Sequence, residues 1–236
     1  MRILALDTTT RAGSLALLDG ERVVVERTGD AARTHAERLP GELLDALADA
    51  GWSTSDVDVY AVASGPGSFT GLRIGIATIQ GLAFVHGARV APVSALRALA
   101  EAAAQGRPAG TRVGAWMDAF RQEVFSALYE VRIETAGGAS TLVEVEGPMV
   151  GTPTSAVARW ASRPPSVLCG DGAVLYAASV PAGTTVMPSP RLAPIIASLA
   201  AASDGRGQTV SPAGLQPLYV RRPDAEIARD AARQPS

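Results

Sequence analysis

Hydrophobic and polar positions follow a regular order along the chain, and this order predicts its elements. Three short apolar runs, at residues 3–6, 14–18 and 23–26, indicate strands. Asp19-Gly20 lies between the last two runs and is typical of a tight hairpin turn. The chain is therefore expected to begin with a small antiparallel meander.

A helix is expected next, over residues 34–50. Its apolar positions fall on one helical face: Leu39, Leu43 and Leu47. Thr34 and Glu37 have the spacing of a capping box at its start, and Gly51 is a typical helix end. Pro40 lies inside this helix and is expected to kink it.

The remaining pattern completes one unit and then repeats it. A buried strand at 57–63, a helix at 70–86, a strand at 89–93 and a helix at 94–104 complete the first half, and 105–111 is linker-like. The second half is expected to contain strands at 113–117, 124–131 and 142–145, a turn at 136–140, helices at 154–161, 173–179 and 192–202, and strands at 167–169 and 185–187. Two halves of strand, strand, strand, helix, strand, helix, strand, helix predict a duplicated α/β unit.

This duplicated βββαβαβα order is the one used by the two-lobed actin-like, sugar kinase and Hsp70 (ASKHA) superfamily. We expect an N-terminal lobe at 1–106 that binds a partner, and a C-terminal lobe at 107–210. For the C-terminal segment at 211–236, both packing against the first lobe and a disordered end are considered. Asp7 and Asp118 each close the first strand of their half. Gly65-Pro66-Gly67 and Gly170-Asp171-Gly172 each follow a buried strand and precede a helix.

Composition and charge narrow the function classes. A net charge of −2 and the absence of any block of basic residues argue against a strong direct grip on an RNA backbone. The longest uncharged stretch considered, 74–88, is too short to span a bilayer, so no membrane association is expected and the protein is predicted to be cytoplasmic. Cys169 is the single cysteine, which excludes an internal disulfide and favours a packing role.

The segment from Gly65 to Gly75 has two interpretations. A strand that passes into a helix can present backbone N–H groups to a phosphate, so the weak cofactor-binding candidates are Asp7, Thr8, Gly65, Gly67 and Ser68. The segment lacks the Lys of a phosphate-binding P-loop and has no Asp for magnesium. The glycines would otherwise permit a tight turn and close packing, and Asp7 would bond to nearby turn amides.

Residues suited to catalysis or metal binding are scarce. The two histidines, His35 and His86, are far apart in sequence, so they do not form a helical metal-binding pair. Ser68 does not lie in a G-x-S-x-G motif, so the sequence gives no support for a hydrolase pair with His35 as its distant base. We therefore assign no catalytic residue, no metal ligand and no cofactor to this chain.

The helix over 70–86 is apolar on all sides, so both of its sides need to be covered. One side is expected to pack on its own sheet and the other against a partner subunit. Gly71, Gly75 and Gly81 would let a second backbone come close. The alternative is that this helix is covered fully within the chain.

Short segments over nearly the full length of the chain match one known family. They are Ile3-Leu4-Ala5-Leu6-Asp7-Thr8-Thr9, His35-Ala36-Glu37-Arg38-Leu39, GPGSFTGLRIG at 65–75, Val93-Ser94-Ala95-Leu96, Met117-Asp118-Ala119, Glu123-Val124-Phe125, Gly170-Asp171-Gly172-Ala173 and Pro217-Leu218-Tyr219-Val220-Arg221. In these segments the chain resembles TsaB, also called YeaZ, of bacterial tRNA threonylcarbamoyladenosine synthesis. Phe120 departs from the family, which more often has a basic residue there.

The resemblance implies a non-catalytic subunit, a pseudoenzyme, that holds its paralogue TsaD in a competent state. TsaD would carry the ATP and metal chemistry and transfer threonylcarbamoyl to the tRNA adenosine, and the ATPase TsaE would dock on the pair. The chain would form a homodimer when TsaD is absent and would reach tRNA through the complex. The family's TsaD-binding surface implies helices 34–50 and 70–86, with the interface candidates Leu43, Leu47, Leu72, Ile76, Ile79 and Ala83.

Two other functions stay open from the sequence. One is an ATP-binding or glycoprotease-like enzyme of the same superfamily. The other is a domain of this fold with an unrelated partner.

Overall fold

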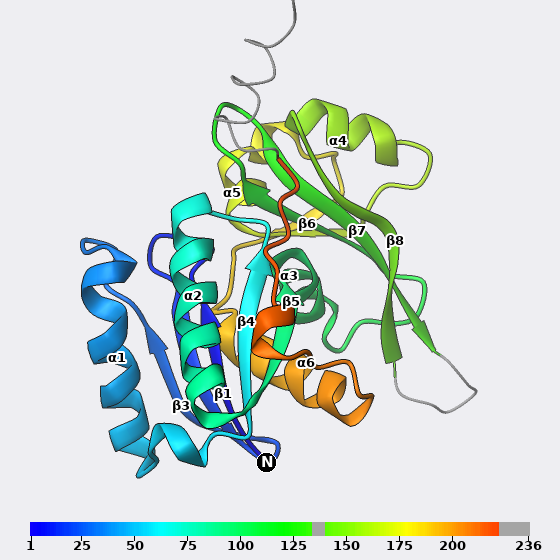
Figure 1. Ribbon diagram of the computed structural model, residues 1–236. Coiled ribbons are helices and arrows are strands. Elements are labelled where there is room, and N and C mark those ends of the chain that lie inside the picture. Colours follow the sequence, from blue (N-terminus) through cyan, green and yellow to red (C-terminus); the bar gives the residue numbers. More distant parts are fainter. Residues whose placement is uncertain (134–139, 222–236) are drawn as a thin grey trace, which may run out of the picture.

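The computed structural model describes residues 1–133 and 140–221, which form two five-stranded mixed sheets with helices between and around them (Figure 1). Except for Ser140, the turn expected at 136–140 lies outside the described residues, as does the chain from residue 222 onward.

Both sheets have the same strand order. The first contains β1 (Arg2–Asp7), β2 (Ser14–Asp19), β3 (Arg22–Thr28), β4 (Val59–Gly65) and β5 (Arg89–Ser94), in the order β3-β2-β1-β4-β5. The second contains β6 (Arg112–Asp118), β7 (Val124–Ile133), β8 (Ser140–Gly151), β9 (Val167–Cys169) and β10 (Thr185–Met187), in the order β8-β7-β6-β9-β10. In each sheet the first strand pairs antiparallel with the second and parallel with the fourth. The duplicated unit and the two-lobed fold class are therefore confirmed.

The helices cover both faces of each sheet. α1 (His35–Ala50) and α2 (Phe69–His86) pack on one face of the first sheet. α3 (Ala95–Ala104) and α6 (Ala193–Gly205) share one apolar core with both sheets. α4 (Pro153–Trp160) and α5 (Asp171–Leu175) cover the other face of the second sheet. Short 3-10 turns lie at Thr54–Asp56, Ala177–Ser179 and Pro212–Gly214.

Local sequence signals fix the ends of α1. Thr34 N donates to Glu37 Oε2 at 2.8 Å, and Glu37 N donates to Thr34 Oγ1 at 3.4 Å, so the capping box is confirmed. The helix ends at Gly51, whose φ of 67° is left-handed. Pro40 lies inside α1 and does not end it.

Two second-half elements differ from their expected lengths. β8 extends over Ser140–Gly151, well beyond 142–145, because pairing with β7 holds polar and Pro-containing positions in the strand. The helix expected at 173–179 is the five-residue α5 followed by the 3-10 turn Ala177–Ser179. Tertiary pairing, rather than local propensity, sets these bounds.

The last part of the described chain returns to the first sheet. α6 packs on β1, β2, β4 and β5, although its sequence position lies within the expected C-terminal lobe. Val210 then pairs with Val90, and Leu218 N donates to Ser64 O at 2.7 Å. The lobe boundaries expected at residues 106 and 210 stay a prediction. Helix α6 lies between these boundaries in the sequence, and it joins the two halves by packing on the first sheet.

Candidate functional site

The glycine-rich segment packs directly against the loop that follows β1. Gly71 and Gly75 lie four residues apart on one side of α2, and Gly67 lies just before its cap, Ser68. A Cβ atom on Gly67 would lie 2.5 Å from Thr9 Cβ, and one on Gly71 or Gly75 would overlap Thr8. We call Thr8, Thr9 and these three glycines the glycine seam. The close approach that the glycines allow is made within the chain.

The backbone donors at the start of α2 are largely occupied by the protein itself. Ser68 N donates to Thr9 O at 2.9 Å, and Ser68 Oγ accepts from Gly71 N at 3.3 Å as the helix cap. Gly65, with a φ of 122°, lies so close to Leu218 that a Cβ would be 2.7 Å from the Leu218 carbonyl oxygen. This geometry favours close packing over a phosphate cradle.

Asp7 closes β1 and orders the turn after it. Its Oδ1 accepts from Thr9 N at 2.9 Å and from Thr9 Oγ1 at 2.6 Å. Burial raises the pKa of Asp7 above its ordinary value, against the opposing effects of the Thr9 bonds and of His35. Thr8 is fully buried, and its hydroxyl has no hydrogen-bond partner in the described part of the chain. Asp7 thus accepts a hydrogen bond from a turn amide. This is the alternative to phosphate binding that the sequence offered for Asp7.

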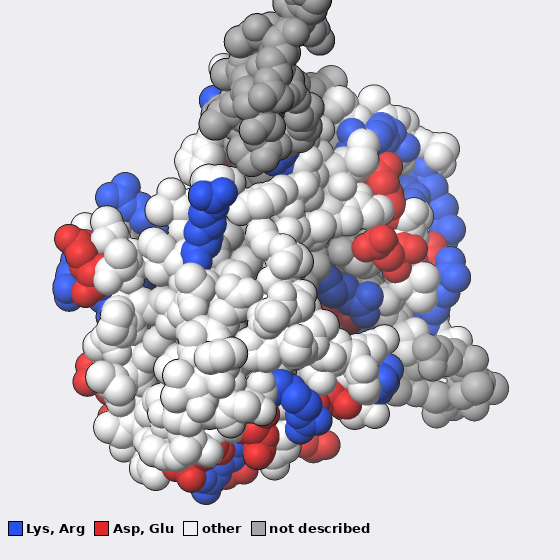
Figure 2. Space-filling view, viewed as in Figure 1, with Lys and Arg blue, Asp and Glu red and all other residues white. Residues whose placement is uncertain are grey.

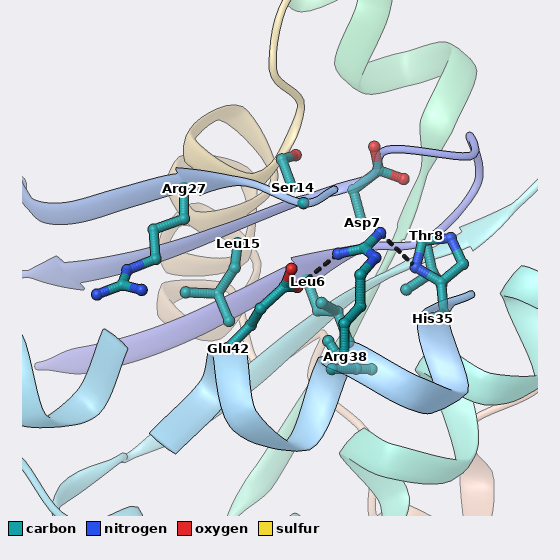
Figure 3. A pocket seen from close by; sticks show the side chains of 11 residues that line it. Leu6, Asp7, Thr8, Ser14, Leu15, Arg27, His35, Arg38 and Glu42 are labelled. Atoms are coloured by element: carbon teal, nitrogen blue, oxygen red, sulfur yellow. Dashed lines mark hydrogen bonds and ion pairs between the residues drawn. The ribbon is translucent and has the colours of Figure 1, made fainter. Parts of the chain in front are cut away.

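The first turns of α1 hold the same loop from the other side (Figure 3). The Nε2 of His35 donates to Thr10 O at 2.9 Å, because a carbonyl oxygen can only accept. The Nδ1 of His35 is therefore free to accept from Arg38 Nη2 at 2.9 Å. Arg38 is almost fully buried, bonds also to Ala12 O, and forms an ion pair with Glu42. The His35 motif singled out in the sequence is thus a clamp from α1 onto the loop after β1.

A cleft of about 480 Å³ separates the two halves of the molecule. On one side it is lined by the loop after β1 and by the starts of α1 and α2. On the other side it is lined by Met117, Asp118, Phe120 and Asp171. Ser68 is the one cofactor candidate among its lining residues. The turns that follow the first strand of each half therefore face each other across this cleft.

The turn after β6 has an uncommon backbone. Phe120, Arg121 and Gln122 have φ values of 58°, 55° and 61°, in the left-handed region that non-glycine residues seldom adopt. Arg221 stabilises this turn by donating to Ala119 O at 2.6 Å and by pairing with Glu123. The sequence placed Arg221 in a segment that matches the family but gave no sign of its contact with this turn. The Phe120 departure from the family pattern lies in this same turn.

The polar side chains of Ser68, His35 and Asp171 line the cleft and are held by hydrogen bonds within the protein. In residues 1–133 and 140–221, no three His, Cys, Asp or Glu side chains come together as a metal site. Ser68 and His35 both line the cleft, but Ser68 Oγ caps α2 and His35 binds Thr10 and Arg38. Burial and the neighbouring Asp118 raise the pKa of Asp171, whose Oδ1 accepts from Asp118 N at 3.1 Å. The Asp171 carboxylate thus holds the backbone of the turn after β6 through the Asp118 N–H.

The six interface candidates expected from the sequence lie in the core of this chain rather than on its surface. All six are at most 6% exposed: Leu43, Leu47, Leu72, Ile76, Ile79 and Ala83. All but Leu72 belong to one apolar cluster between α1, α2 and the first sheet. For the candidates on α2, the reason is that an all-apolar helix must turn one stripe toward its own sheet, and its sequence does not say which. Leu43 and Leu47 instead lie on the apolar face of α1, which packs in the same cluster.

Other apolar side chains of α1 and α2 are exposed instead. Leu44 is 64% exposed, Phe84 79% and Val85 75%. A broad uncharged face extends over α2 and the neighbouring C-terminal segment (Figure 2). Gly81 faces open space, with nothing within 4 Å of a Cβ built on it. Phe84 and Val85 lie outside the buried stripe of α2. Their position relative to that stripe was the sequence signal for their exposure.

An aromatic and cationic cluster lies at the beginning of the same helix. The rings of Phe69 and Tyr219 are 5.3 Å apart, and the Arg73 guanidinium lies 4.0 Å from the Phe69 ring centroid. Arg73 Nε donates to Tyr219 Oη at 3.2 Å. The C-terminal segment therefore contributes side chains to this face of α2.

Comparison with known proteins links the whole chain to one group. A family model described as TsaD, tRNA N6-adenosine threonylcarbamoyltransferase, matches residues 28–158. An uncharacterised protein of Mycobacterium tuberculosis is 36% identical over 229 residues, which cover 95% of this chain and 93% of that protein. The structure of YeaZ from Pseudomonas aeruginosa aligns with a TM-score of 0.76 at 33% identity, over 92% of this chain and 99% of that one.

Named relatives match over about half of their length. The tRNA threonylcarbamoyladenosine biosynthesis protein TsaB of Haemophilus influenzae is 42% identical over 126 residues, which cover 53% of this chain and 52% of that protein. The TsaB protein of Escherichia coli is 40% identical over 130 residues, with 55% of each chain covered.

Proposed function

Because this chain belongs to the TsaB/YeaZ family of tRNA threonylcarbamoyladenosine biosynthesis proteins, we propose that it is the non-catalytic subunit that binds and activates TsaD. The observation that carries the proposal is the exposure of two adjacent apolar side chains on α2, Phe84 and Val85, which are both more than 70% exposed. Contiguous exposed apolar surface of this kind is typical of a protein interface. Ser68 caps its own helix and His35 binds the loop after β1, and both engagements support a role without catalysis.

The docking surface comprises the exposed sides of α1 and α2 and the adjoining C-terminal segment. Leu44, Phe84 and Val85 supply apolar area, while Phe69 and Tyr219 add aromatic side chains near the start of α2. Aromatic residues dominate the energetics of many interfaces. In the absence of TsaD the same face joins two copies of this chain.

The other components follow from the same assignment. ATP and metal are held by the partner subunits, TsaE docks on the pair, and tRNA is bound through the complex rather than by this chain directly. The net charge of −2 supports an indirect contact with tRNA. Among the helices described here, none has the length and apolar character needed to cross a membrane. The complex is proposed to act in the cytoplasm.

The docking surface is tested by placing a charge on it. Phe84→Glu is expected to abolish co-elution with TsaD in size-exclusion chromatography, because an unpaired charge would be buried at the interface. Val174→Glu is the matched control, since Val174 is 51% exposed but lies on α5 of the second half. Ile76 is unsuitable because a charge there would enter the core. Retention of the complex by Phe84→Glu would refute this surface.

The non-catalytic assignment needs a separate measurement. Isothermal titration of the isolated chain with ATP and magnesium is expected to show no micromolar binding and no turnover. Binding followed by hydrolysis would show an enzyme instead. Restoring the modified adenosine in the tRNA of a TsaB-depleted bacterium tests the pathway itself, independently of which surface docks.

A further inference from the structure

The last described residues connect the two halves of the molecule. After the 3-10 turn Pro212–Gly214, the chain passes α2 and the end of β4 and then reaches the second sheet (Figure 1). Leu215 is buried in the apolar cluster of the first half, whereas Val220 packs against the core that α3 and α6 share with both sheets. We call residues 216–221 the strap.

One end of the strap is anchored on the first half. The ring of Tyr219 packs on Phe69, and its hydroxyl accepts from Arg73 Nε. Leu218 N donates to Ser64 O at the end of β4. Tyr219 is 38% exposed and Phe69 39%, so both rings also belong to the surface that a partner can contact.

The other end of the strap holds the turn after β6. Arg221 Nη1 donates to Ala119 O, its Nη2 pairs with Glu123, and its guanidinium lies 5.7 Å from the Phe125 ring centroid. Two backbone bonds of 3.0 Å close this turn, from Ala119 N to Glu123 O and from Glu123 N to Phe120 O. Left-handed backbone persists only where its surroundings hold it, and Arg221 supplies such a hold from outside the turn.

The two anchors are linked because little else holds the strap. Among the backbone hydrogen bonds of the described residues, only the one from Leu218 N involves residues 216–221. Pro217 has no N–H to donate, and a segment with few backbone bonds opens at a low cost in free energy. Two residues of extended chain span at most about 7 Å. A strap that lifts Tyr219 from α2 therefore also moves Arg221.

We propose that the strap couples the docking surface on α2 to the turn after β6 at the cleft. In the seated state Tyr219 lies on Phe69 and Arg221 holds the turn, and in the lifted state both contacts are lost together. A partner that packs on both rings finds them in place only in the seated state, so it binds that state more tightly. Docking thus fixes Phe120 at the cleft, and by reciprocity the loss of the Arg221 contacts weakens docking. This coupling rests on the proposed docking of TsaD.

The first test uses the full chain without a partner. Tyr219→Ala is expected to raise the amide exchange rates of Ala119 and Glu123 about tenfold in NMR of the ¹⁵N-labelled chain, the effect of losing an aromatic pair. Tyr219→Phe keeps the ring and should leave these rates within about twofold. Val23→Ala on β3 is the matched control, because Val23 is also 38% exposed. Unchanged rates in Tyr219→Ala, or equally faster rates in the control, would overturn the coupling.

The second test measures docking from the far end of the strap. Arg221→Ala is expected to weaken TsaD binding about fivefold in isothermal titration, although Arg221 contacts the turn rather than α2. Arg191→Ala is the matched control, because Arg191 pairs with Glu26 of β3 outside the strap, and it should bind TsaD like the parent chain. Equal affinities of the parent and Arg221→Ala would overturn the coupling and leave the docking proposal intact.

The reciprocal effect completes the test. Bound TsaD is expected to slow amide exchange at Ala119 and Glu123 about fivefold in the parent chain and to have no such effect in Tyr219→Ala. Equal slowing in both chains would show that TsaD contacts the turn directly, and it would overturn the strap as the link. If the parent chain does not bind TsaD at all, the proposed function fails, and the first test, which needs no partner, still measures the link between the two anchors.

Discussion

The turns that follow β1 and β6 occupy equivalent places in the two halves, yet they are built differently. After β1, Asp7 and Thr8 are buried, and Thr8 packs against α2 in the glycine seam. After β6, Phe120 is 67% exposed at the cleft, in a left-handed backbone held by Arg221. A duplicated topology therefore conserves the position of a turn but not its packing.

The helix that follows the glycines explains the difference. Both halves use glycine where a strand passes into a helix, and a Cβ on Gly172 would lie 2.9 Å from the Met117 carbonyl carbon. In the first half the next helix has 18 residues and carries Gly71 and Gly75, so the seam continues along it. In the second half α5 has only five residues. Only the first turn is thus covered by a long helix.

The largest effect is expected from breaking the seam. Gly71→Ala should lower the free energy of unfolding by about 3 kcal/mol, because its Cβ would overlap the Thr8 carbonyl. Gly81→Ala on the same helix is the control and should raise stability by up to about 1 kcal/mol, since Gly81 faces open space. Urea denaturation measures both. Equal stabilities for the two variants would contradict a packed seam.

The two arginine clamps offer a second contrast. Arg38→Ala is expected to cost about 2 kcal/mol, because its bonds to Ala12 O and His35 are buried. Arg221→Ala is expected to cost about 1 kcal/mol, since Arg221 is more exposed and its partner Glu123 can be hydrated. Thermal unfolding followed by circular dichroism distinguishes them. A larger loss of stability for Arg221→Ala would show that the turn after β6 depends on its arginine more than the loop after β1 does.

The buried Asp7 predicts a pH-dependent difference. Its folded pKa is raised, so its contribution to stability is fully present below the unfolded pKa and is lost as the pH rises through the folded pKa. Asp7→Asn keeps an acceptor for Thr9 and should therefore be more stable than the parent chain at pH 7. The gain should disappear near pH 3.5. Urea midpoints measured from pH 3.5 to pH 7 test this, and a gain independent of pH would exclude ionisation as its cause.

The smallest effect is expected at the strained turn. Phe120→Asn should raise stability by about 0.5 kcal/mol, because Asn adopts left-handed angles more readily than Phe. Gly13→Asn in the first turn should instead lower it, since a Cβ there would overlap the Asp7 carbonyl oxygen. Calorimetric melting of both variants measures the difference. A change in stability of the same sign in both variants would show that the two turns are equally constrained.

Much of the fold could be predicted because its signals are local. Thr34, Glu37 and Gly51 act over three or four residues, and they fixed the ends of α1. The repeated order of elements identified the duplicated unit. Gly71, Gly75 and Gly81 indicated a close approach by another backbone, and the structure shows a close approach at Gly71 and Gly75 but none at Gly81. The residue that approaches Gly71 and Gly75 is Thr8, more than fifty residues earlier in the chain, and no local pattern could give that.

The sequence by itself determined the element order, the two-lobed class and the family. Tertiary structure decided which stripe of α2 is buried, because an all-apolar helix has no polar face to point outward. It also placed α6 on the first sheet and Arg221 on the turn after β6. These contacts join distant segments, so they depend on how complete sheets pack rather than on the periodicity within any one element.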